Sequence, residues 1–466
     1  MEVPDVPTEQ RERATQLEAT LRELLGEPNL APRGGPGRPW TIPAAVLWSG
    51  LLVCVLRGFH QKVDLWRALC VHGLWHVPRY DVTEMAVEDR LKTAAADALA
   101  PLLAHVTEAV EQRWQDLSCC ELAPFAKAIL AVDHTILDLV LRYRRILREL
   151  PKGDRCLLPG ALGCVFDIRR QLWVKLQYLA DPQQDLHTAV RSLTAGFAAG
   201  TLLLFDLGYF AFWFFDELTE AGYHFVTRWR GKVTYSVEHV FYEGGNARAR
   251  LFDALIYPGV HRADRAAHPL RMIRITVLKG SRWETYQYVT NVLDPRVLPA
   301  WQVAALYRRR WDIEKAFDLV KTHLGLRLLW SSQSNVLLHQ IYATFILCQV
   351  VLALRNEIAV RAQADLREVS LPLMIRWLPR LAADGHDAVA EFVRAGRRAG
   401  YIRPFRGQTW EVPTVTDAEY CWPERPPGQR EARYGSRDYC QRTYQRDAEK
   451  AARRARYWPE AEDREL

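Results

Sequence analysis

The sequence lacks the cysteine patterns of a disulfide-bonded or zinc-binding protein. It has nine cysteines, an odd number, and no two of them are spaced as C-x-x-C. We interpret them as reduced thiols, most of them in the core of a cytoplasmic protein. The first residues, MEVPDVPTEQRER, also lack the basic and apolar segments of a secretion signal, so we expect no export.

Other common functional signatures are missing as well. The sequence contains no glycine-rich phosphate-binding loop, no nucleophile elbow around a serine and no internal repeat. We therefore expect no nucleotide cofactor. The apolar run 44–56 is too short to span a membrane, and the run 341–354 is interrupted by Thr344 and Gln349. Both runs predict buried helices, so we expect no membrane partner.

The composition is that of a folded protein with a moderate excess of positive charge. With 466 residues and 49% hydrophobic content, the chain has enough apolar side chains for two or three domains. Its 62 basic and 55 acidic residues give a net charge of +7. This charge favours polyanionic partners but does not by itself identify a nucleic acid.

Residues 306–324, LYRRRWDIEKAFDLVKTHL, are the most informative segment. The spacing of its apolar residues predicts a helix, at about 3.6 residues per turn, with one face in the core. The residues on that face are Leu306, Ile313, Phe317, Val320 and Leu324.

A stripe of polar side chains lies beside this apolar face. Tyr307, Arg310, Glu314 and Lys321, spaced Y-x2-R-x3-E-x6-K, follow one line at the border between core and solvent. A carboxylate there can bind a divalent cation, and the guanidinium and ammonium groups can bind phosphate oxygens. The alternative is a solvated helix face with ordinary ion pairs.

Two aspartates follow short apolar runs. Asp133 follows the run 125–132 and Asp206 follows the run 201–205, and we expect both runs to be buried strands of an α/β protein. Each aspartate alone is also compatible with a helix N-cap. Together with Glu314 they supply the carboxylates of a two-metal phosphoryl-transfer site. Such oxygen ligands favour Mg²⁺ or Mn²⁺ over zinc.

These motifs lead to a known family. The sequences VDHT around Asp133, FDLGYF around Asp206 and the Y-x2-R-x3-E-x6-K stripe resemble the DDE transposases of bacterial insertion sequences, specifically the insertion-sequence-four group. The resemblance implies an RNase H-like catalytic core in which Asp133, Asp206 and Glu314 are the catalytic acids. It also implies that these acids bind two Mg²⁺ ions, for which Mn²⁺ can substitute.

The resemblance further implies a reaction and its partners. The reaction is metal-dependent cleavage at transposon ends followed by strand transfer into target DNA, in some members through a hairpin intermediate. Tyr307, Arg310 and Lys321 would position phosphates of double-stranded DNA. A homodimer would form in the synaptic complex, and the protein would reside in the bacterial cytoplasm at the nucleoid.

We expect a divided α/β catalytic core with helical regions at both ends. The predicted parts, in chain order, are a helical N-terminal DNA-binding region (1–120), the first part of the RNase H-like core (121–222), a β-rich insertion (223–300), the second part of the core (301–345), a helical C-terminal region (346–420) and a basic tail (421–466).

Aromatic and basic residues of the insertion are further candidates for DNA contact. Arg228, Trp229 and Arg230 suit phosphate contact and base stacking, although a solvated edge strand explains them equally well. In relatives that form hairpins, an aromatic near the end of the insertion stacks on a flipped base. Tyr286 lies at about that place instead of the tryptophan of those relatives, and Trp283 is close by.

Two other functions fit the same residues. One is an RNase H-like DNA nuclease without transposition, which would hydrolyse DNA and give no strand-transfer product. The other is a transposase-derived sequence-specific DNA-binding protein, which would bind DNA and not cleave it with Mg²⁺ or Mn²⁺.

Overall fold

The computed structural model describes residues 41–59, 61–74, 79–113, 122–136, 161–179, 186–260, 264–324, 326, 330–331, 333–404 and 412–435. The first 40 residues of the predicted N-terminal region and the predicted tail beyond residue 435 lie outside these ranges. The described strands are β1 (Ile129–Ile136), β2 (Ala161–Asp167), β3 (Leu172–Leu179), β4 (Leu202–Leu204), β5 (His224–Arg228), β6 (Tyr235–Gly245), β7 (Ala249–Pro258), β8 (Asp264–Arg265), β9 (Leu270–Lys279), β10 (Arg282–Thr290) and β11 (Arg433–Tyr434).

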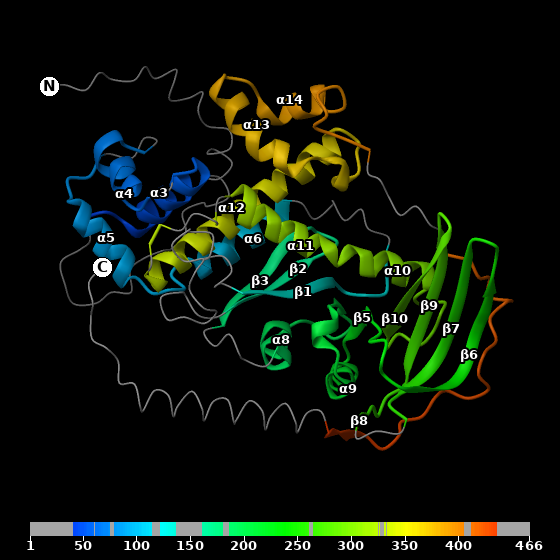
Figure 1. Cartoon of the computed structure of the whole chain (residues 1–466). Helices are drawn as coiled ribbons and strands as arrows, with labels where there is room; N and C mark the ends of the chain where they lie inside the picture. Colours follow the sequence, from blue (N-terminus) through cyan, green and yellow to red (C-terminus); the bar gives the residue numbers. More distant parts are fainter. Residues whose placement is uncertain are drawn as a thin grey trace, which may run out of the picture.

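The described helices lie on both sides of the strands and at the N-terminal side of the molecule (Figure 1). They are α3 (Ala44–Leu56), α4 (Val63–Trp66), η1 (Arg67–His72), α5 (Glu84–Thr93), α6 (Ala100–Arg113), α8 (Leu186–Thr194), η4 (Leu207–Tyr209), α9 (Phe212–Glu220), α10 (Ala300–Arg309), α11 (Trp311–Asp318), η5 (Leu319–His323), α12 (Ser334–Arg361), η6 (Leu366–Glu368), α13 (Leu371–Ala383) and α14 (Ala388–Ala395).

A nine-stranded mixed sheet connects the catalytic candidates to the predicted insertion. Its order is β3-β2-β1-β4-β5-β10-β9-β7-β6. Strand β1 pairs antiparallel with β2 and parallel with β4, and β4 pairs parallel with β5. Helices α10, α11 and α12 lie along one face of the sheet, and α8 and α9 lie on the other (Figure 1). The predicted α/β class is confirmed.

Strand β1 is buried on both faces, as its continuous apolar sequence predicts. Ile129 and Ala131 belong to the core beneath α10–α12, whereas Leu130 and Val132 belong to the core beneath α8 and α9. Successive side chains of a strand point to opposite faces. Alternate residues of β1 therefore pack into two separate cores, one on each face of the sheet.

The predicted end of this first strand is wrong. We expected the strand to finish before Asp133, but β1 continues to Ile136 because the antiparallel partner β2 pairs with it as far as Ile136↔Ala161. The parallel pairing with β4 does stop earlier, at Ala131↔Leu204. Asp133 therefore lies inside the strand but beyond the end of its parallel ladder.

The segment 223–300 is rich in strands, and these strands extend the central sheet. Strand β5 pairs parallel with β4 and antiparallel with β10, so it joins the two parts of the sheet. Strands β9, β7 and β6 follow in antiparallel order. Backbone hydrogen bonds between β4 and β5 therefore connect this segment to the core strands.

Helix α12 is the one described helix that is long and apolar enough to cross a membrane. It has 28 residues, and the mean hydropathy of its most apolar window is 1.9. All of that window is buried inside the protein, which confirms the predicted buried helix. Its polar residue Gln349 forms hydrogen bonds inside the protein. The side-chain amide accepts from Trp173 N at 2.9 Å and donates to Trp173 O at 2.7 Å.

The segment 306–324 is divided into three helical pieces rather than one helix. The bonds Arg310 N to Tyr307 O and Ile313 N to Arg310 O span three residues instead of four, which tightens the chain between α10 and α11. A π-helical turn, η5, then follows. The predicted apolar face is nonetheless confirmed, because all five of its residues are buried.

The described part of the predicted basic tail is docked on the sheet. Strand β11 pairs with β8, and the Tyr434 hydroxyl donates to Asp216 at 2.7 Å. Cys421 N donates to the carbonyl of Phe241 in β6 at 2.8 Å. Residues 412–435 therefore belong to the folded protein. The cysteines in the described ranges are unpaired, as predicted.

The buried ion pair between Arg271 and Asp253 predicts a large effect on stability. Both side chains are fully buried, and Arg271 donates to both oxygens of Asp253 and to Leu298 O. The change Arg271→Ala leaves a buried unpaired carboxylate, so we expect it to lower the free energy of unfolding by about 3–5 kcal/mol. Urea unfolding measures this change.

The matched control is Arg296→Ala. Arg296 also donates to both oxygens of an aspartate, Asp294, but it is 57% exposed. We expect a loss below about 1 kcal/mol. Equal losses for the two variants would contradict the prediction.

Candidate active site

The register of the sheet places the two predicted aspartates side by side. Ala131 of β1 is paired with Leu204 of β4, and Asp133 and Asp206 each lie two residues further along. Adjacent strands are about 4.8 Å apart. Asp133 also lies on the same face of β1 as Ala131, which is the face covered by α10–α12. The two acids therefore face the helices that carry the polar stripe.

The turn between α10 and α11 brings the stripe to this edge of the sheet. The Tyr307 hydroxyl donates to Asp206 Oδ1 at 3.3 Å, and Arg310 Nη2 donates to Glu314 Oε1 at 2.7 Å. Tyr307 and Arg310 are only 6% and 4% exposed, deeper than the border position that we predicted. The Glu314 side chain is 34% exposed. The tightened turn at Arg310 accounts for this difference, because it rotates α10 relative to α11.

The pKa of Asp133 depends on the charged groups around it. Burial raises it to about 6, and the negative charges of Glu314 and Asp206 add to this increase. The backbone N–H of His134 and the positive charge of Arg310 oppose it. Two carboxylates and one guanidinium thus influence the carboxyl group of Asp133, as expected when charges lie close together in a partly buried site.

Lys321 is held by the same strand that carries Asp133. Its Nζ donates to Thr135 Oγ1 at 2.6 Å. Thr135 is buried and lies on the same face of β1 as Asp133. Lys321 belongs to the π-helical turn η5, whose extra residue per turn changes the direction of its side chain relative to an α-helix. The four residues of the stripe therefore surround the two aspartates.

A side-chain contact that the sequence does not indicate links the residue after Asp133 to the turn after Asp206. His134 Nδ1 is hydrogen-bonded to the hydroxyl of Tyr209, which lies in η4 directly after Asp206. His134 is on the face of β1 opposite to Asp133, and burial lowers its pKa to about 4, so the ring is neutral. Each residue follows a candidate acid within three positions, but nothing in the sequence indicates that they pair.

Gly163 makes room for this histidine. A Cβ atom added at Gly163 would lie 2.9 Å from His134 Nε2 and 2.6 Å from a methyl group of Leu193. Gly163 is paired with His134 across β1 and β2. The absence of a side chain at this position therefore allows the imidazole to lie flat against the sheet beside α8.

The predicted basic cluster is divided between surface and core. Arg228 is exposed, and its charge lowers the pKa of Tyr307, which burial raises to about 12. Arg230 is exposed and donates to Leu207 O at 3.2 Å, next to Asp206. Trp229 is buried and packs edge-on against Phe210 and Tyr235. The predicted role of Trp229 in base stacking is therefore wrong, because its ring is part of the core.

The two other predicted aromatics lie on opposite faces of β10. Tyr286 lies on the same face as Tyr288, whose ring is 5.3 Å from that of Tyr307. The Tyr286 hydroxyl is bonded to Glu284 and Lys279, both at 2.6 Å. Trp283 points to the other face, is 40% exposed and stacks with Arg250. Only Tyr286 is on the side of the candidate site.

The donor chemistry of the site fits a divalent cation such as Mg²⁺. Asp133, Asp206 and Glu314 offer carboxylate oxygens, the ligands that Mg²⁺ prefers. Within the described ranges, however, no three His, Cys, Asp or Glu side chains are gathered closely enough to hold one ion. In this conformation Glu314 is paired with Arg310 and Asp206 with Tyr307. The residues therefore fit the ion by type, while their side chains are bonded to neighbouring groups.

Comparison with known proteins finds a similarity to one family. Residues 165–348 match the model of the family described as "Transposase DDE domain". The match includes Asp206, Tyr307, Arg310, Glu314 and Lys321 and begins after Asp133. This part of the chain is therefore similar to a transposase DDE domain, and the predicted resemblance to DDE transposases is confirmed. Membership of the insertion-sequence-four group stays a prediction.

One curated relative is also named as a transposase. The protein named "Putative transposase y4zB" from Sinorhizobium fredii is 26% identical over 215 residues, which are 43% of this chain and 56% of that protein. The chain thus spans about half the length of this relative. A solved piggyBac transposase in a synaptic complex with hairpin DNA aligns over 89% of this chain and 85% of its own, at 9% identity. Its TM-score of 0.34 is too low to establish a shared fold.

The bond between His134 and Tyr209 can be tested by hydrogen exchange. We expect Tyr209→Phe to speed amide exchange in residues 133–135 and 206–210 by about fivefold to tenfold, because a lost hydrogen bond costs about 1 kcal/mol. The control is Tyr223→Phe, which removes a hydroxyl bonded to Phe197 O at 3.0 Å. The control should change exchange near residues 194–197 only. Unchanged exchange near Asp133 in Tyr209→Phe would refute the link.

Proposed function

We propose that this protein is a DNA transposase that cleaves DNA at transposon ends and joins the freed strand to target DNA. One observation carries the proposal. The parallel pairing of β1 and β4 sets Asp133 level with Asp206, and the α10–α11 turn bonds Tyr307 to Asp206 on the same side. Three acids and a phosphate-binding stripe on one sheet edge are the parts that phosphodiester chemistry requires.

The sheet order supports an RNase H-like core. Three antiparallel strands, β3-β2-β1, are followed by two strands parallel to β1, β4 and β5. In an RNase H-like core of this order, acids on the first and fourth strands lie side by side. The match of residues 165–348 to a transposase DDE domain supports the same assignment. The segment 223–300 would then be an insertion that extends the core sheet.

Asp133, Asp206 and Glu314 would hold two Mg²⁺ ions, with Mn²⁺ as a substitute. Such ions activate the attacking water or hydroxyl and stabilise the leaving oxygen. Arg310 is bonded to one oxygen of Glu314 and Tyr307 to one oxygen of Asp206, so each carboxylate has a second oxygen with which it could hold an ion. The guanidinium of Arg310 and the phenol of Tyr307 would bind phosphate oxygens of the DNA.

The remaining cations would position the DNA backbone. Lys321 is fixed by Thr135 and supplies a point charge beside Asp133. Arg228 and Arg230 are exposed at the end of β5, next to the turn that follows Asp206. Double-stranded DNA would therefore approach along the exposed side of Arg228 and Arg230 and reach the acids past Tyr307.

Tyr286 is the better candidate to stack on a flipped base. It lies two residues from Tyr288 on the same face of β10, about 7 Å along the strand, and Tyr288 contacts Tyr307. Trp283 is on the opposite face. A hairpin intermediate requires such a stacking partner near the acids. The reaction would follow a cut-and-paste route in a homodimeric synaptic complex, in the bacterial cytoplasm and without a nucleotide cofactor.

The change Glu314→Gln tests the catalytic assignment. We expect cleavage of a transposon-end duplex with Mg²⁺ or Mn²⁺ to fall at least about 1,000-fold, with DNA affinity changed less than about threefold, because a neutral amide is a poor ligand for the metal. Single-turnover cleavage and a gel-shift titration measure the two quantities.

The control is Glu357→Gln, since Glu357 also pairs with an arginine one helical turn away, on α12. It should cleave normally. Retained cleavage in Glu314→Gln would remove Glu314 from the mechanism. Hydrolysis without a strand-transfer product would favour a nuclease, and binding without cleavage by the unmodified protein would favour a DNA-binding protein.

The variants Tyr286→Ala and Trp283→Ala distinguish the two aromatics. We expect Tyr286→Ala to reduce the yield of hairpin ends by about tenfold, since base stacking contributes about 1–3 kcal/mol. First-strand nicking should change little. Trp283→Ala should leave both steps within about twofold. A larger effect of Trp283→Ala on hairpin yield, measured on denaturing gels, would contradict the placement.

A further inference from the structure

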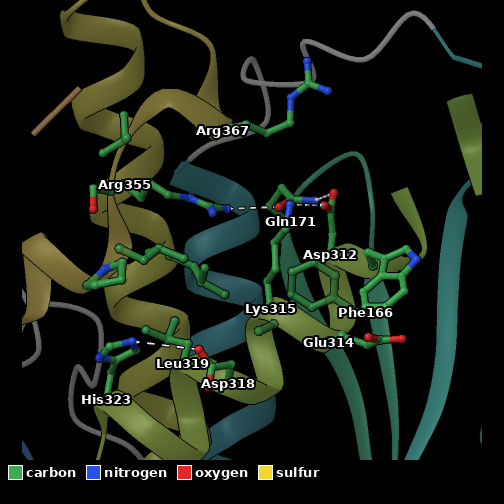
Figure 2. A pocket seen from close by; sticks show the side chains of 17 residues that line it. Phe166, Gln171, Asp312, Glu314, Lys315, Asp318, Leu319, His323, Arg355 and Arg367 are labelled. Carbon is green, nitrogen blue, oxygen red and sulfur yellow. Dashed lines mark hydrogen bonds and ion pairs between the residues drawn. The ribbon is translucent and has the colours of Figure 1, made fainter. Parts of the chain in front are cut away.

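A cavity of about 480 Å³ lies on the far side of the helix that carries Glu314. Its walls come from α11, η5, α12 and the segment 367–372 (Figure 2). Glu314 lies at the edge of the cavity, and Figure 2 shows its carboxylate directed away from Arg355. The cavity is therefore separate from the space between the three acids, although one helix borders both.

Arg355 of α12 is a buried cation on this wall. It is 6% exposed, and its Nη2 donates to the neutral oxygen Oε1 of Gln171 at 3.1 Å. Its Nε has no hydrogen-bond partner, and no carboxylate of the described residues forms an ion pair with it. Burial lowers the pKa of its guanidinium to about 10. A buried charge without a counter-ion is costly, so an anionic ligand would stabilise it.

The nearest carboxylate does not pair directly with Arg355. Asp312 accepts from Arg309 Nε at 2.5 Å, lies 3.6 Å from Lys315 and reaches Arg355 through Gln171. Figure 2 shows the contacts from Arg355 through Gln171 to Asp312. The amide of Gln171 therefore lies between the two charges.

The other carboxylates around the cavity have partners of their own. Glu314 is paired with Arg310, and Asp365, whose charge acts on Arg355, is paired with Arg367 at 2.6 Å. Asp318 is 62% exposed at the edge, so solvent screens its charge. Among the described residues, no carboxylate is in direct contact with Arg355.

We propose that this cavity binds a phosphate group carried on a nucleotide, with Arg355 as its main ligand and Lys315 at its entrance. A terminal phosphate carries a charge of about −1.5 to −2 and would supply the direct counter-ion that Arg355 lacks among the described residues. Arginine binds phosphate oxygens with directed hydrogen bonds. The cavity is larger than a phosphate, and its apolar wall, formed by Leu319, Leu352 and Val369, suits an attached nucleoside.

The proposal does not depend on the proposed DNA cleavage, because binding is measured without any reaction. The phosphate can come from a free nucleotide or from the 5′ end of a DNA strand. In either case the ligand contacts α11, so its binding would affect the helix that positions Glu314.

Calorimetry with the full chain tests the site with three probes: deoxyadenosine 5′-monophosphate, inorganic phosphate and deoxyadenosine. We expect saturable binding of the nucleotide with a Kd below about 1 mM, weaker binding of phosphate and no binding of deoxyadenosine. Arg355→Met and Lys315→Glu should weaken nucleotide binding at least tenfold and threefold, respectively. The control Arg376→Met, which removes an exposed arginine of α13, should bind normally.

Thermal unfolding separates this role from a structural one. Arg355→Met removes an unbalanced buried charge, so without ligand its midpoint should equal or exceed that of the unmodified protein. Millimolar nucleotide should raise the midpoint of the unmodified protein and not that of the variant. A destabilised variant that nucleotide stabilises as much as the unmodified protein would overturn the proposal.

Competition identifies the source of the phosphate. If a 5′-phosphorylated duplex displaces the nucleotide and an unphosphorylated duplex does not, the ligand is a DNA end. If neither duplex displaces it, the ligand is a free nucleotide. The proposal is overturned if the nucleotide does not bind saturably, if deoxyadenosine binds equally well, or if Arg376→Met loses as much binding as Arg355→Met.

Discussion

The parallel pairing of β1 with β4 is the constraint on which the site depends. Backbone hydrogen bonds fix the register Ala131↔Leu204, and this register alone sets Asp133 level with Asp206. A slip of one residue would move one aspartate to the opposite face of the sheet. Two buried cores, one on each face, oppose such a slip because alternate side chains of β1 belong to each of them. The geometry of the acids is thus secured by the hydrophobic packing of the residues of β1 that directly precede Asp133.

Strand β1 also connects the elements that surround it. Asp133 faces the three-acid site, His134 is bonded to Tyr209 on the turn after Asp206, and Thr135 is bonded to Lys321 after α11. Consecutive residues of a strand point to opposite faces, so three neighbouring positions reach elements on both sides of the sheet. The helices and turns of the site are therefore positioned relative to one strand.

The parts that sequence predicts well are those with a local signal. Continuous apolar runs indicate buried strands, and helical spacing indicates the buried face of segment 306–324 and the long helix α12. The end of β1 was wrong because β2, a strand distant in sequence, prolongs it. Trp229 was misassigned because Phe210 and Tyr235, which bury it, are also distant in the chain.

Features made by several distant segments had no sequence signal at all. The pairing of His134 with Tyr209 joins residues 75 positions apart. The contact of Arg355 with Gln171 joins residues 184 positions apart, and the cavity beside it needs four separate elements. Arg355 lies in the last turns of the mostly apolar helix α12, and the sequence alone does not distinguish it from an exposed charged residue near a helix end. Tertiary contacts, not local propensity, determine these sites.

The docked segment before residue 435 has a consequence for association between copies of the chain. Strand β6 is the last strand of the sheet, and an open edge of this kind invites strands from another molecule. Here Cys421 N bonds to the β6 carbonyl of Phe241, and the ring of His239 in β6 bonds to Cys421 O. The protein thus blocks part of this edge with its own chain. Two copies therefore cannot continue the sheet across the blocked part of β6.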